Sequence, residues 1–426
     1  MYDGKIKALI LKMRTILHSD LNNFYASVEC LRNPEIRDKP VVVVGSKEDR
    51  HGIVLAKNLI AKRAGVATGD VWWEAQRKCG PELVEVKADF AAYLDVSRAV
   101  RRIYEDYTDK IEAFGIDECW LDVTESEKQA GGEEIAHAIR RRIKKELGLT
   151  VSIGVSWNKV FAKLGSDMNK PDAVTVISPD NFRQTVWTLP AEELLYVGRA
   201  TKGKLNRMGI FTIGELANSD RDALKHRLGK WGEWLHDFAN GKDSSRVVKT
   251  SEEQNVKSIG NSLTVWRDLK NREEVSMVIF MLADSVAARM RESGLFLART
   301  AHIFARGSDL NSFHKQGKLP RPTGAANEIA RAALNLFDRV YDWETPVRGL
   351  GVSVSDFHFG GVQTDMFSDC VKADRQKRLD EAVDKIRKKY GNKIIQLAVV
   401  HKEPKLKELD VKGEHVIHPY SFFRHD

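Results

Sequence analysis

The sequence is poor in cysteine and contains no long hydrophobic run. Its four cysteines lie far apart, without the CxxC spacing of a redox or zinc site. They are Cys30, Cys79, Cys119 and Cys370. No apolar stretch approaches the roughly 20 residues that a membrane-spanning helix requires, and no small-residue cleavage site follows the first residues. We therefore expect a cytoplasmic protein with reduced thiols and without a membrane span.

The length and the net charge of the chain indicate its number of domains and the kind of partner it binds. The 426 residues predict two to four domains, because single cores rarely grow beyond roughly 250–300 residues. A hydrophobic content of 42% with 30% charged residues is typical of a globular protein. The net charge of +8 and the pI near 9.1 indicate a polyanionic partner such as nucleic acid.

Two adjacent carboxylates interrupt an apolar, β-prone stretch. Asp117 and Glu118 lie between residues 113–116 and 119–123, which predicts a tight hairpin with both acids at its bend. Carboxylates at short range disfavour joint ionisation. Mg²⁺ relieves that repulsion, and a pair of such ions can hold both oxygens of a phosphoryl transfer. A solvated surface turn is the alternative for this dipeptide taken alone.

A third acid lies far upstream, where a strand is expected to pass into a helix. Asp20 follows a predicted strand over residues 14–19 and precedes a predicted helix over residues 22–30. Its carboxylate and the free amides of the helix start would face the same space, and helix N-termini attract phosphate. We expect a metal-bound triphosphate there. The alternative is that Asp20 only caps the helix.

Two lysines form a third element. Lys163 and Lys170 are seven residues apart on a predicted helix, hence on one face, and Pro171 is expected to end that helix at Lys170. A lysine at this edge can reach a phosphate as a flexible point charge. A solvated basic helix is the alternative.

The remaining pattern predicts several domains. Up to residue 155, strands alternate with helices, one of them over residues 89–110, as expected for a sheet covered by helices on one face. A βαββαβ order, expected to be a ferredoxin-like unit, comprises strand 258–266, helix 272–293, strands 299–306 and 311–316, helix 325–341 and strand 349–357. After it we expect a charged helix over residues 379–389 and a strand over residues 393–401.

Three strings together resemble the Y-family translesion DNA polymerases, including the DNA polymerase IV and UmuC-like branches. They are DLNNFYASVE from Asp20, GIDECWLD from Gly115 and NKVFAKLGSDMNKP from Asn158. The resemblance implies an α+β multidomain, right-hand polymerase with a ferredoxin-like palm, small fingers, a helical helix-hairpin-helix thumb and a βαββαβ little finger. The implied boundaries are palm 1–34 and 83–186, fingers 35–82, thumb 187–249, little finger 250–360 and C-terminal tail 361–426.

The same resemblance implies the catalytic groups. Asp20, Asp117 and Glu118 match the family's catalytic carboxylates, which with the backbone carbonyl of Leu21 would bind two Mg²⁺ ions.

It also implies the nucleotide contacts. Asn23 and Phe24 would offer backbone amides to the phosphates, and Lys170 would bind the triphosphate. Tyr25 falls on the steric-gate position, where a bulky ring beneath the sugar would clash with a 2′-hydroxyl.

The fingers depart from the commoner family pattern. Many members carry a tyrosine and an arginine that grip the triphosphate, with a serine or threonine nearby. This chain has Leu59, Lys62 and Ala56 at the aligned positions. Only Lys62 remains as a phosphate contact, and it lacks the bidentate fork of arginine. The segment is closer to the UmuC-like form.

Two further segments predict partners. Residues 197–205 are similar to a helix-hairpin-helix turn, which binds the DNA backbone without reading sequence; the implied contacts are Gly198, Thr201, Lys202, Gly203 and Lys204. Residues 363–367 resemble the peptide by which bacterial polymerases dock on the sliding clamp. Gln363 would make hydrogen bonds while Met366 and Phe367 fill a pocket.

The sequence thus predicts a DNA-templated DNA polymerase that transfers a nucleotide from a dNTP to a primer 3′-hydroxyl with two Mg²⁺ ions. No second acidic cluster suggests a proofreading exonuclease, so low fidelity in translesion synthesis is expected. The expected partners are primer–template DNA, dNTP and a bacterial sliding clamp. One alternative is a weak UmuC-like subunit that needs accessory proteins. A second is a nucleotidyl cyclase, but such an enzyme needs no helix-hairpin-helix. A third is a catalytically silent DNA- or clamp-binding protein, but such a protein need not keep the three acids.

Overall fold

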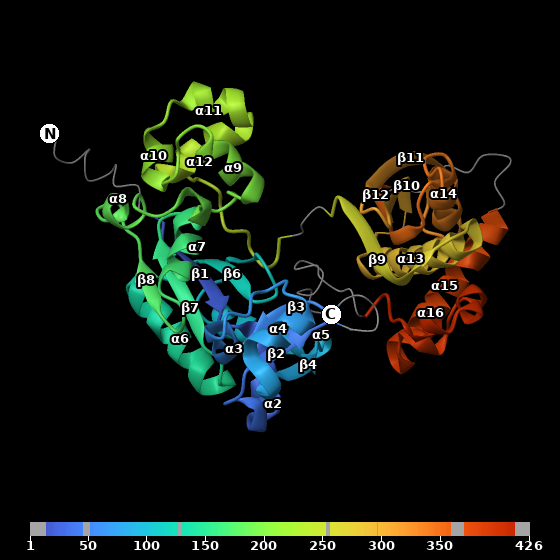
Figure 1. The fold of residues 1–426 in the computed structure, drawn as a ribbon, viewed down its shortest axis with the longest axis horizontal. Coiled ribbons are helices and arrows are strands. Elements are labelled where there is room, and N and C mark those ends of the chain that lie inside the picture. Colours follow the sequence, from blue (N-terminus) through green and yellow to red (C-terminus); the bar gives the residue numbers. More distant parts are fainter. Residues whose placement is uncertain are drawn as a thin grey trace.

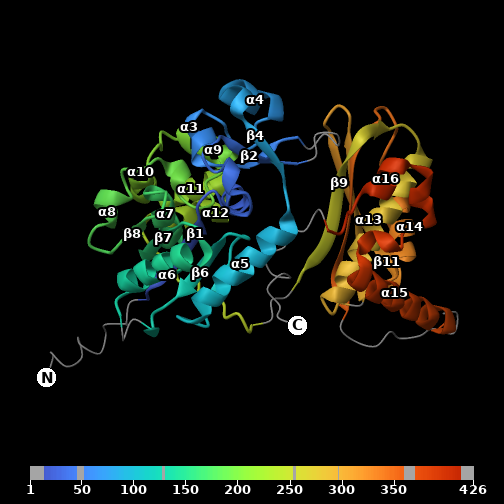
Figure 2. The same cartoon turned by 90° about the horizontal axis from the view of Figure 1, so that it is seen from below.

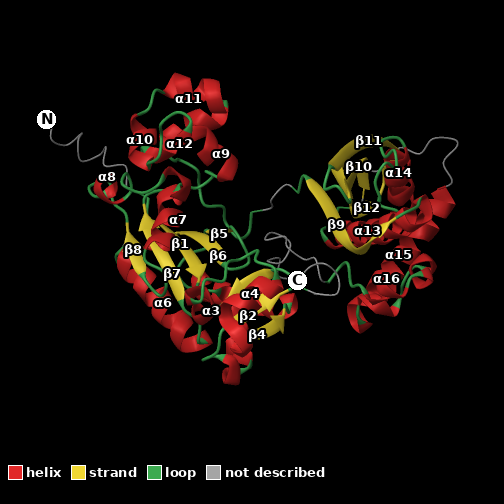
Figure 3. Ribbon diagram, viewed as in Figure 1, coloured by secondary structure: helices red, strands yellow, loops and turns green. Residues whose placement is uncertain are grey.

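The computed structural model describes residues 14–45, 52–126, 130–252, 256–295, 297–358 and 370–413. These residues form three β-sheets and a helical cluster (Figures 1 and 3). One sheet lies at the centre of the larger lobe, a second beside it, and the third in a separate lobe that also carries the C-terminal helices.

The central sheet is the predicted palm. Its order is β5-β6-β1-β7-β8, and β1 pairs antiparallel with both β6 and β7. The strands are β1 Ile16–Leu21, β5 Ile111–Ala113, β6 Glu118–Asp122, β7 Val151–Ser156 and β8 Val174–Val176. The main helices are α2 Phe24–Arg32, α5 Phe90–Glu105, α6 Gly132–Leu147 and α7 Lys159–Met168. Helix α5 ends at Glu105, five residues before the predicted end.

The palm sheet is covered on both faces, so the expectation of helices on one face only was wrong. The core under α2, α5 and α6 receives Leu17 and Leu121. The neighbouring residues Ile16 and Trp120 point to the opposite face, where they meet Ala162 of α7. This follows from the two-residue period of a strand. Gly154 lets α7 approach closely, because a Cβ there would come within 1.9 Å of the Ala162 carbonyl oxygen.

The second sheet carries the predicted fingers. Its order is β3-β2-β4, with β4 parallel to β2. The elements are β2 Val41–Val44, β3 Val54–Lys57, α3 Leu59–Arg63, α4 Trp72–Cys79 and β4 Val84–Lys87. Strand β4 therefore belongs with this sheet, although the boundary expected at residue 83 places it in the palm. After β4 has paired in parallel with β2, α5 leads the chain back to the palm.

The predicted thumb is helical and packs on α7 (Figure 1). Its helices are α8 Phe182–Thr185, α9 Arg199–Asn206, α10 Ile213–Asn218, α11 Arg221–Leu228 and α12 Lys230–Ala239. Val160, Phe161 and Leu164 of α7 share one buried cluster with Leu205 and Leu235 of the thumb. The helix that carries the two site lysines is thus also the base of the thumb.

The βαββαβ order predicted for the little finger is confirmed. Its elements are β9 Ser258–Leu269, α13 Arg272–Glu292, β10 Leu297–Gly307, β11 Ser312–Thr323, α14 Ala326–Asp338 and β12 Val347–His358. The antiparallel sheet has the order β11-β10-β12-β9, so its second and fourth strands are central. A ferredoxin-like sheet has the first and third strands there, so the element order was predicted correctly and the strand order was not. Figure 2 shows this sheet turned toward the fingers, with its helices on the far side.

The C-terminal tail extends the little finger. Helix α15 (Cys370–Tyr390) contains the predicted charged helix, but the strand expected over residues 393–401 is wrong. That segment forms short 3₁₀ turns and leads to α16 (Pro404–Glu408), because Val400 and Leu406 are buried in the little-finger core. Ion pairs fix α15 on α13, among them Arg291–Asp384 at 2.6 Å. Within the described ranges, no helix has the length and apolarity to cross a membrane.

Candidate active site

Strand pairing brings the three predicted carboxylates to one edge of the palm sheet. Asp20 on β1 lies directly opposite Glu118 on β6. The Leu21 amide donates a hydrogen bond to the Asp117 carbonyl at 3.1 Å. The predicted hairpin is present, since the Phe114 amide donates to the Glu118 carbonyl at 3.0 Å. Acids nearly 100 residues apart in sequence therefore share one site.

The start of α2 lies beside these acids. Asp20 is inside β1 and is buried, so it does not cap the helix. The N-cap is Asn23, in the left-handed region at φ 50°, and α2 begins at Phe24. The amides of Asn23 and Phe24 belong to the first positions of the helix, which have no intrahelical acceptor. They are thus available to an anion.

Both predicted lysines reach the acids, and one reaches further than expected. Lys163 Nζ lies 3.1 Å from Asp20 Oδ2 and 2.9 Å from Glu118 Oε2. Lys170 Nζ lies 2.7 Å from Asp20 Oδ2. Helix α7 ends at Met168, so Lys170 projects from the turn that follows rather than from the helix. The sequence predicted only that Lys163 shares a helix face with Lys170. In the structure its ammonium also bridges the carboxylates of Asp20 and Glu118.

The carboxylates differ in their electrostatics. Burial raises the pKa of Asp117 to about 7, and the charges of Glu118 and Asp20 add to the shift. Burial also opposes ionisation of Glu118, but His18 and Lys163 outweigh it and lower the pKa of Glu118 to about 2. His18 was missed by sequence reasoning; its Nε2 lies 3.3 Å from Glu118 Oε2. With these pKa values, Glu118 is ionised at neutral pH, whereas Asp117 is protonated in part.

This donor set fits a hard divalent cation. Carboxylate and carbonyl oxygens are what Mg²⁺ prefers, and the Lys163 ammonium already lies within ion-pair distance of both Asp20 and Glu118. Glu118 Oε2 is buried and has no well-directed hydrogen bond from the described residues. Those residues include no group of three His, Cys, Asp or Glu side chains arranged as a metal cluster. The acids are near one another, with a lysine between them.

Tyr25, in the first turn of α2, packs against two other aromatic rings. Its ring stacks on Tyr93 at 4.4 Å and 14°, and the edge of Phe90 packs at 5.8 Å. Burial and then the charge of Asp117 raise the pKa of Tyr25 to about 12. The Tyr93 hydroxyl donates to Glu29 at 2.7 Å. Sequence reasoning missed Tyr93, whose only signal was its position on the inner face of α5.

The fingers offer one further cation. Lys62 is exposed on α3, while Leu59 is half-buried at its first turn and Ala56 is half-buried in β3. Burial and the neighbouring Lys62 charge lower the pKa of Lys57. Lys57 was missed by the motif comparison; its ammonium donates a hydrogen bond to Thr68 Oγ1 at 2.9 Å.

The thumb places its predicted contacts differently. Gly198 caps α9, but Thr201, Lys202, Gly203 and Lys204 lie inside that helix rather than in a hairpin turn. The Lys202 ammonium pairs with Glu192. The turn itself comprises the residues before Gly198. Gln363, Met366 and Phe367 lie outside the described residues.

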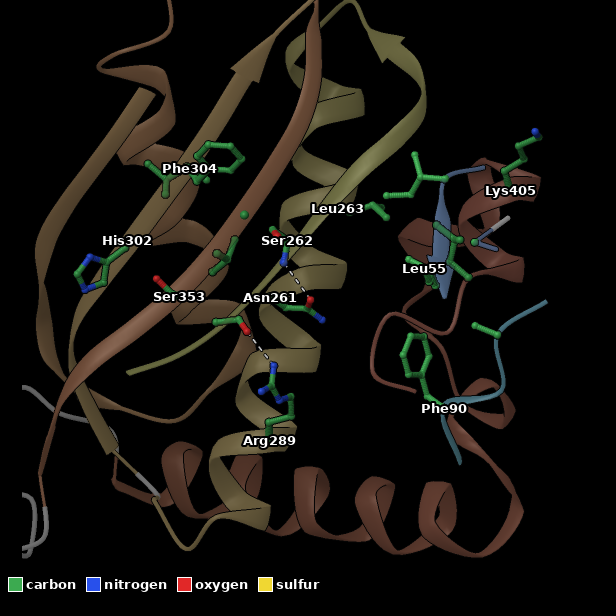
Figure 4. Close-up of a pocket in the computed structure, with 18 of the residues that line it drawn as sticks. Leu55, Phe90, Asn261, Ser262, Leu263, Arg289, His302, Phe304, Ser353 and Lys405 are labelled. Carbon is green, nitrogen blue, oxygen red and sulfur yellow. Dashed lines mark hydrogen bonds between the residues drawn. The ribbon is translucent and has the colours of Figure 1, made fainter. Parts of the chain in front are cut away.

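A cavity of about 1260 Å³ separates the little-finger sheet from the fingers (Figure 4). Ser262, His302 and Phe304 line it from the sheet, and Leu55 and Phe90 line it from the other side. Phe90 also packs on Tyr25, so the cavity adjoins the aromatic rings around Tyr25.

Comparisons with known proteins match most of the chain to one family of DNA polymerases. Residues 19–167 match the impB/mucB/samB family, residues 256–366 its C-terminal domain, and residues 192–243 the "DNA polymerase-iota, thumb domain". "DNA polymerase IV" of Acetivibrio thermocellus is 53% identical over 381 residues, which are 89% of this chain and 95% of that protein. "DNA polymerase IV 1" of Bacillus subtilis is 36% identical over 93% of this chain and 95% of its own length. A solved Y-family DNA polymerase chimera superposes with a TM-score of 0.72 at 25% identity, covering 81% of this chain and all of its own.

Proposed function

The chain belongs to the impB/mucB/samB family of Y-family DNA polymerases and is a DNA-directed DNA polymerase, and we propose that it copies damaged templates by a two-metal reaction without proofreading. The observation that carries the proposal is the juxtaposition of Asp20, Asp117 and Glu118 at one sheet edge, beside the amides that open α2.

In this proposal each group has one task. Asp20 and Glu118 would hold the cations together with Asp117 and the Leu21 carbonyl. When bound, Mg²⁺ would neutralise the phosphates and lower the pKa of the primer 3′-hydroxyl. The amides of α2 and Lys170 orient the triphosphate, so that its leaving group is pyrophosphate.

Sugar selection and DNA binding follow from the surrounding elements. The Tyr25 ring, supported by Tyr93, would close the space beneath the 2′ carbon. The thumb and the face of the little-finger sheet would hold the primer–template, and residues 363–367 would dock on a sliding clamp. We propose the palm, fingers, thumb and little finger at the boundaries expected from the sequence, with two changes: β4 (Val84–Lys87) pairs with the fingers sheet, and α8 (Phe182–Thr185) packs with the thumb helices.

Primer extension by the purified protein tests this proposal. Asp117→Ala and Glu118→Ala should each abolish nucleotide addition and leave DNA affinity nearly unchanged, because these acids hold cations and not the duplex. Asp95→Ala, which removes an exposed carboxylate of α5, is the matched control and should retain full extension. Near-normal extension by either active-site variant would refute the assignment.

A further inference from the structure

Helix α15 turns its charged side toward the little finger and its apolar side toward solvent. On the inner side, Arg291 of α13 pairs with Asp384 at 2.6 Å and with Asp380 at 3.5 Å. Arg387 is buried and pairs with Asp284 of α13 at 2.9 Å. A surface helix ordinarily buries its apolar stripe and exposes its charges. In α15 this arrangement is reversed, so the apolar side chains contribute little to holding the helix on the domain.

The apolar residues on the outer side of α15 form one continuous stripe. Its members recur at intervals of four, three and four residues, which places them on one face of the helix. They are Leu379, Val383, Ile386 and Tyr390, and we call them the α15 stripe. Leu379 is 56% exposed, Ile386 38% and Tyr390 62%, while Val383 is half-buried. A contiguous apolar patch of this kind on a surface usually marks an interaction site.

Cations border the α15 stripe on the side away from α13. Four exposed basic residues lie within one turn of Leu379 or Ile386; they are Arg375, Arg378, Lys385 and Lys389. The acids Asp380 and Asp384, by contrast, are paired with Arg291 on the inner side. The stripe therefore has a positive border. Charge complementarity favours a partner that carries acidic residues beside its apolar ones.

We propose that the α15 stripe docks an amphipathic helix of a partner protein, with aliphatic residues against the stripe and acidic residues against its basic border. This protein contact does not depend on the polymerase reaction. Helices recognise one another through apolar residues at such intervals.

The other occupants fit the α15 stripe less well. A second copy of the chain would bring two positive borders together, which the repulsion of like charges disfavours. Nucleic acid would offer phosphates to the cations, but its bases stack on aromatic rings, and three of the four members of the stripe are aliphatic. Figure 2 shows α15 on the helical side of the little finger, away from the sheet that faces the fingers. The position and the chemistry of the stripe therefore both favour a protein partner.

A designed peptide of matched chemistry tests the proposal. The probe is a fluorescently labelled helical peptide with leucines at heptad positions a and d and glutamates at e and g. A second peptide carries lysines in place of the glutamates. Fluorescence anisotropy with the full chain should show micromolar binding of the acidic peptide and at least about tenfold weaker binding of the basic one.

Two serine variants locate the binding on α15. Leu379→Ser and Ile386→Ser should each weaken binding of the acidic peptide about tenfold, because each removes a large aliphatic contact. Both variants should unfold at the wild-type temperature, because both side chains are exposed. Leu310→Ser is the matched control. It removes a 63% exposed leucine between β10 and β11 and should leave binding unchanged.

Several outcomes would overturn the inference. Absence of binding by the acidic peptide, equal binding of both peptides, or full affinity in both α15 variants would show that the stripe does not select an acidic helix. Dimerisation of the wild type that Ile386→Ser abolishes, measured by light scattering, would make a second copy the occupant. Tighter peptide binding after deletion of residues 414–426 would mean that the end of this chain covers the stripe. A loss of DNA affinity in Ile386→Ser would make nucleic acid the occupant.

Discussion

The Lys163 ammonium should substitute for a metal cation in holding the catalytic edge together. It lies 3.1 Å from Asp20, 2.9 Å from Glu118 and 3.2 Å from Asp167, and its side chain is only 14% exposed. In Lys163→Met these carboxylates lose their shared counter-charge. Removing one partner of a buried ion pair costs about 3–5 kcal/mol. Because Asp167 is 38% exposed and Lys170 still pairs with Asp20, we expect a loss of roughly 2 kcal/mol.

Thermal unfolding with and without Mg²⁺ measures this effect. A loss of roughly 2 kcal/mol corresponds to about 4–8 °C for a domain of this size, so Lys163→Met should unfold that much earlier in the presence of a chelator. Saturating Mg²⁺ should restore most of the difference, because a cation bound only by the folded state stabilises it.

A half-buried lysine of the same domain, whose carboxylate partner is exposed, provides the control. Lys110 pairs at 2.9 Å with Glu125, whose side chain is 79% exposed, so Lys110→Met should change the unfolding temperature little under either condition. An equal deficit of Lys163→Met with and without Mg²⁺ would refute the reasoning, because the lysine would then support the fold independently of the cation site.

Three further predictions concern nucleotide and clamp binding. Tyr25→Ala should admit ribonucleotides while Tyr25→Phe still excludes them, since the ring and not the hydroxyl closes the space; equal discrimination by both in an incorporation assay would place the gate elsewhere. Lys62→Arg should lower the nucleotide KM, and Lys62→Ala should raise it roughly tenfold, because one charged hydrogen bond is lost. Steady-state kinetics tests this, with Arg63→Ala as the control; a larger effect of the control would contradict the prediction. Alanines at the three predicted contacts within residues 363–367 should remove clamp-stimulated synthesis and spare distributive extension, whereas undiminished clamp binding would make the segment a linker.

The meeting of the three acids at one sheet edge was largely predictable because the sequence signals for it are local. An acid at a strand end and two acids at a hairpin bend need only one pairing, Asp20 opposite Glu118, to form the site. The helical periodicities and the βαββαβ order are local in the same sense. The order of the little-finger strands was not predictable, because it depends on which strand edges meet after the helices have crossed the sheet.

The position of Lys163 illustrates what local signals omit. A seven-residue spacing shows that Lys163 and Lys170 share a face of α7, but not which surface that face meets. Gly154 on β7 determines which surface this face of α7 meets, because any side chain at Gly154 would collide with the Ala162 carbonyl. Only a glycine there lets α7 lie close enough to the sheet for Lys163 to reach Asp20. A contact between two backbones leaves no periodic trace in either sequence.

The ring that supports Tyr25 depends partly on local sequence and partly on contacts between distant segments. Glu29 ends the same string of residues that contains Asp20 and Tyr25, and it accepts the hydrogen bond of the Tyr93 hydroxyl. Tyr93 in turn stacks on Tyr25 with the rings nearly parallel. One turn of α2 therefore supplies both the Tyr25 ring and the carboxylate that accepts the hydrogen bond of Tyr93. The string thus fixes the Tyr25 ring through a residue of α5 that it does not contain, and that residue could be identified only once the two helices were placed in contact.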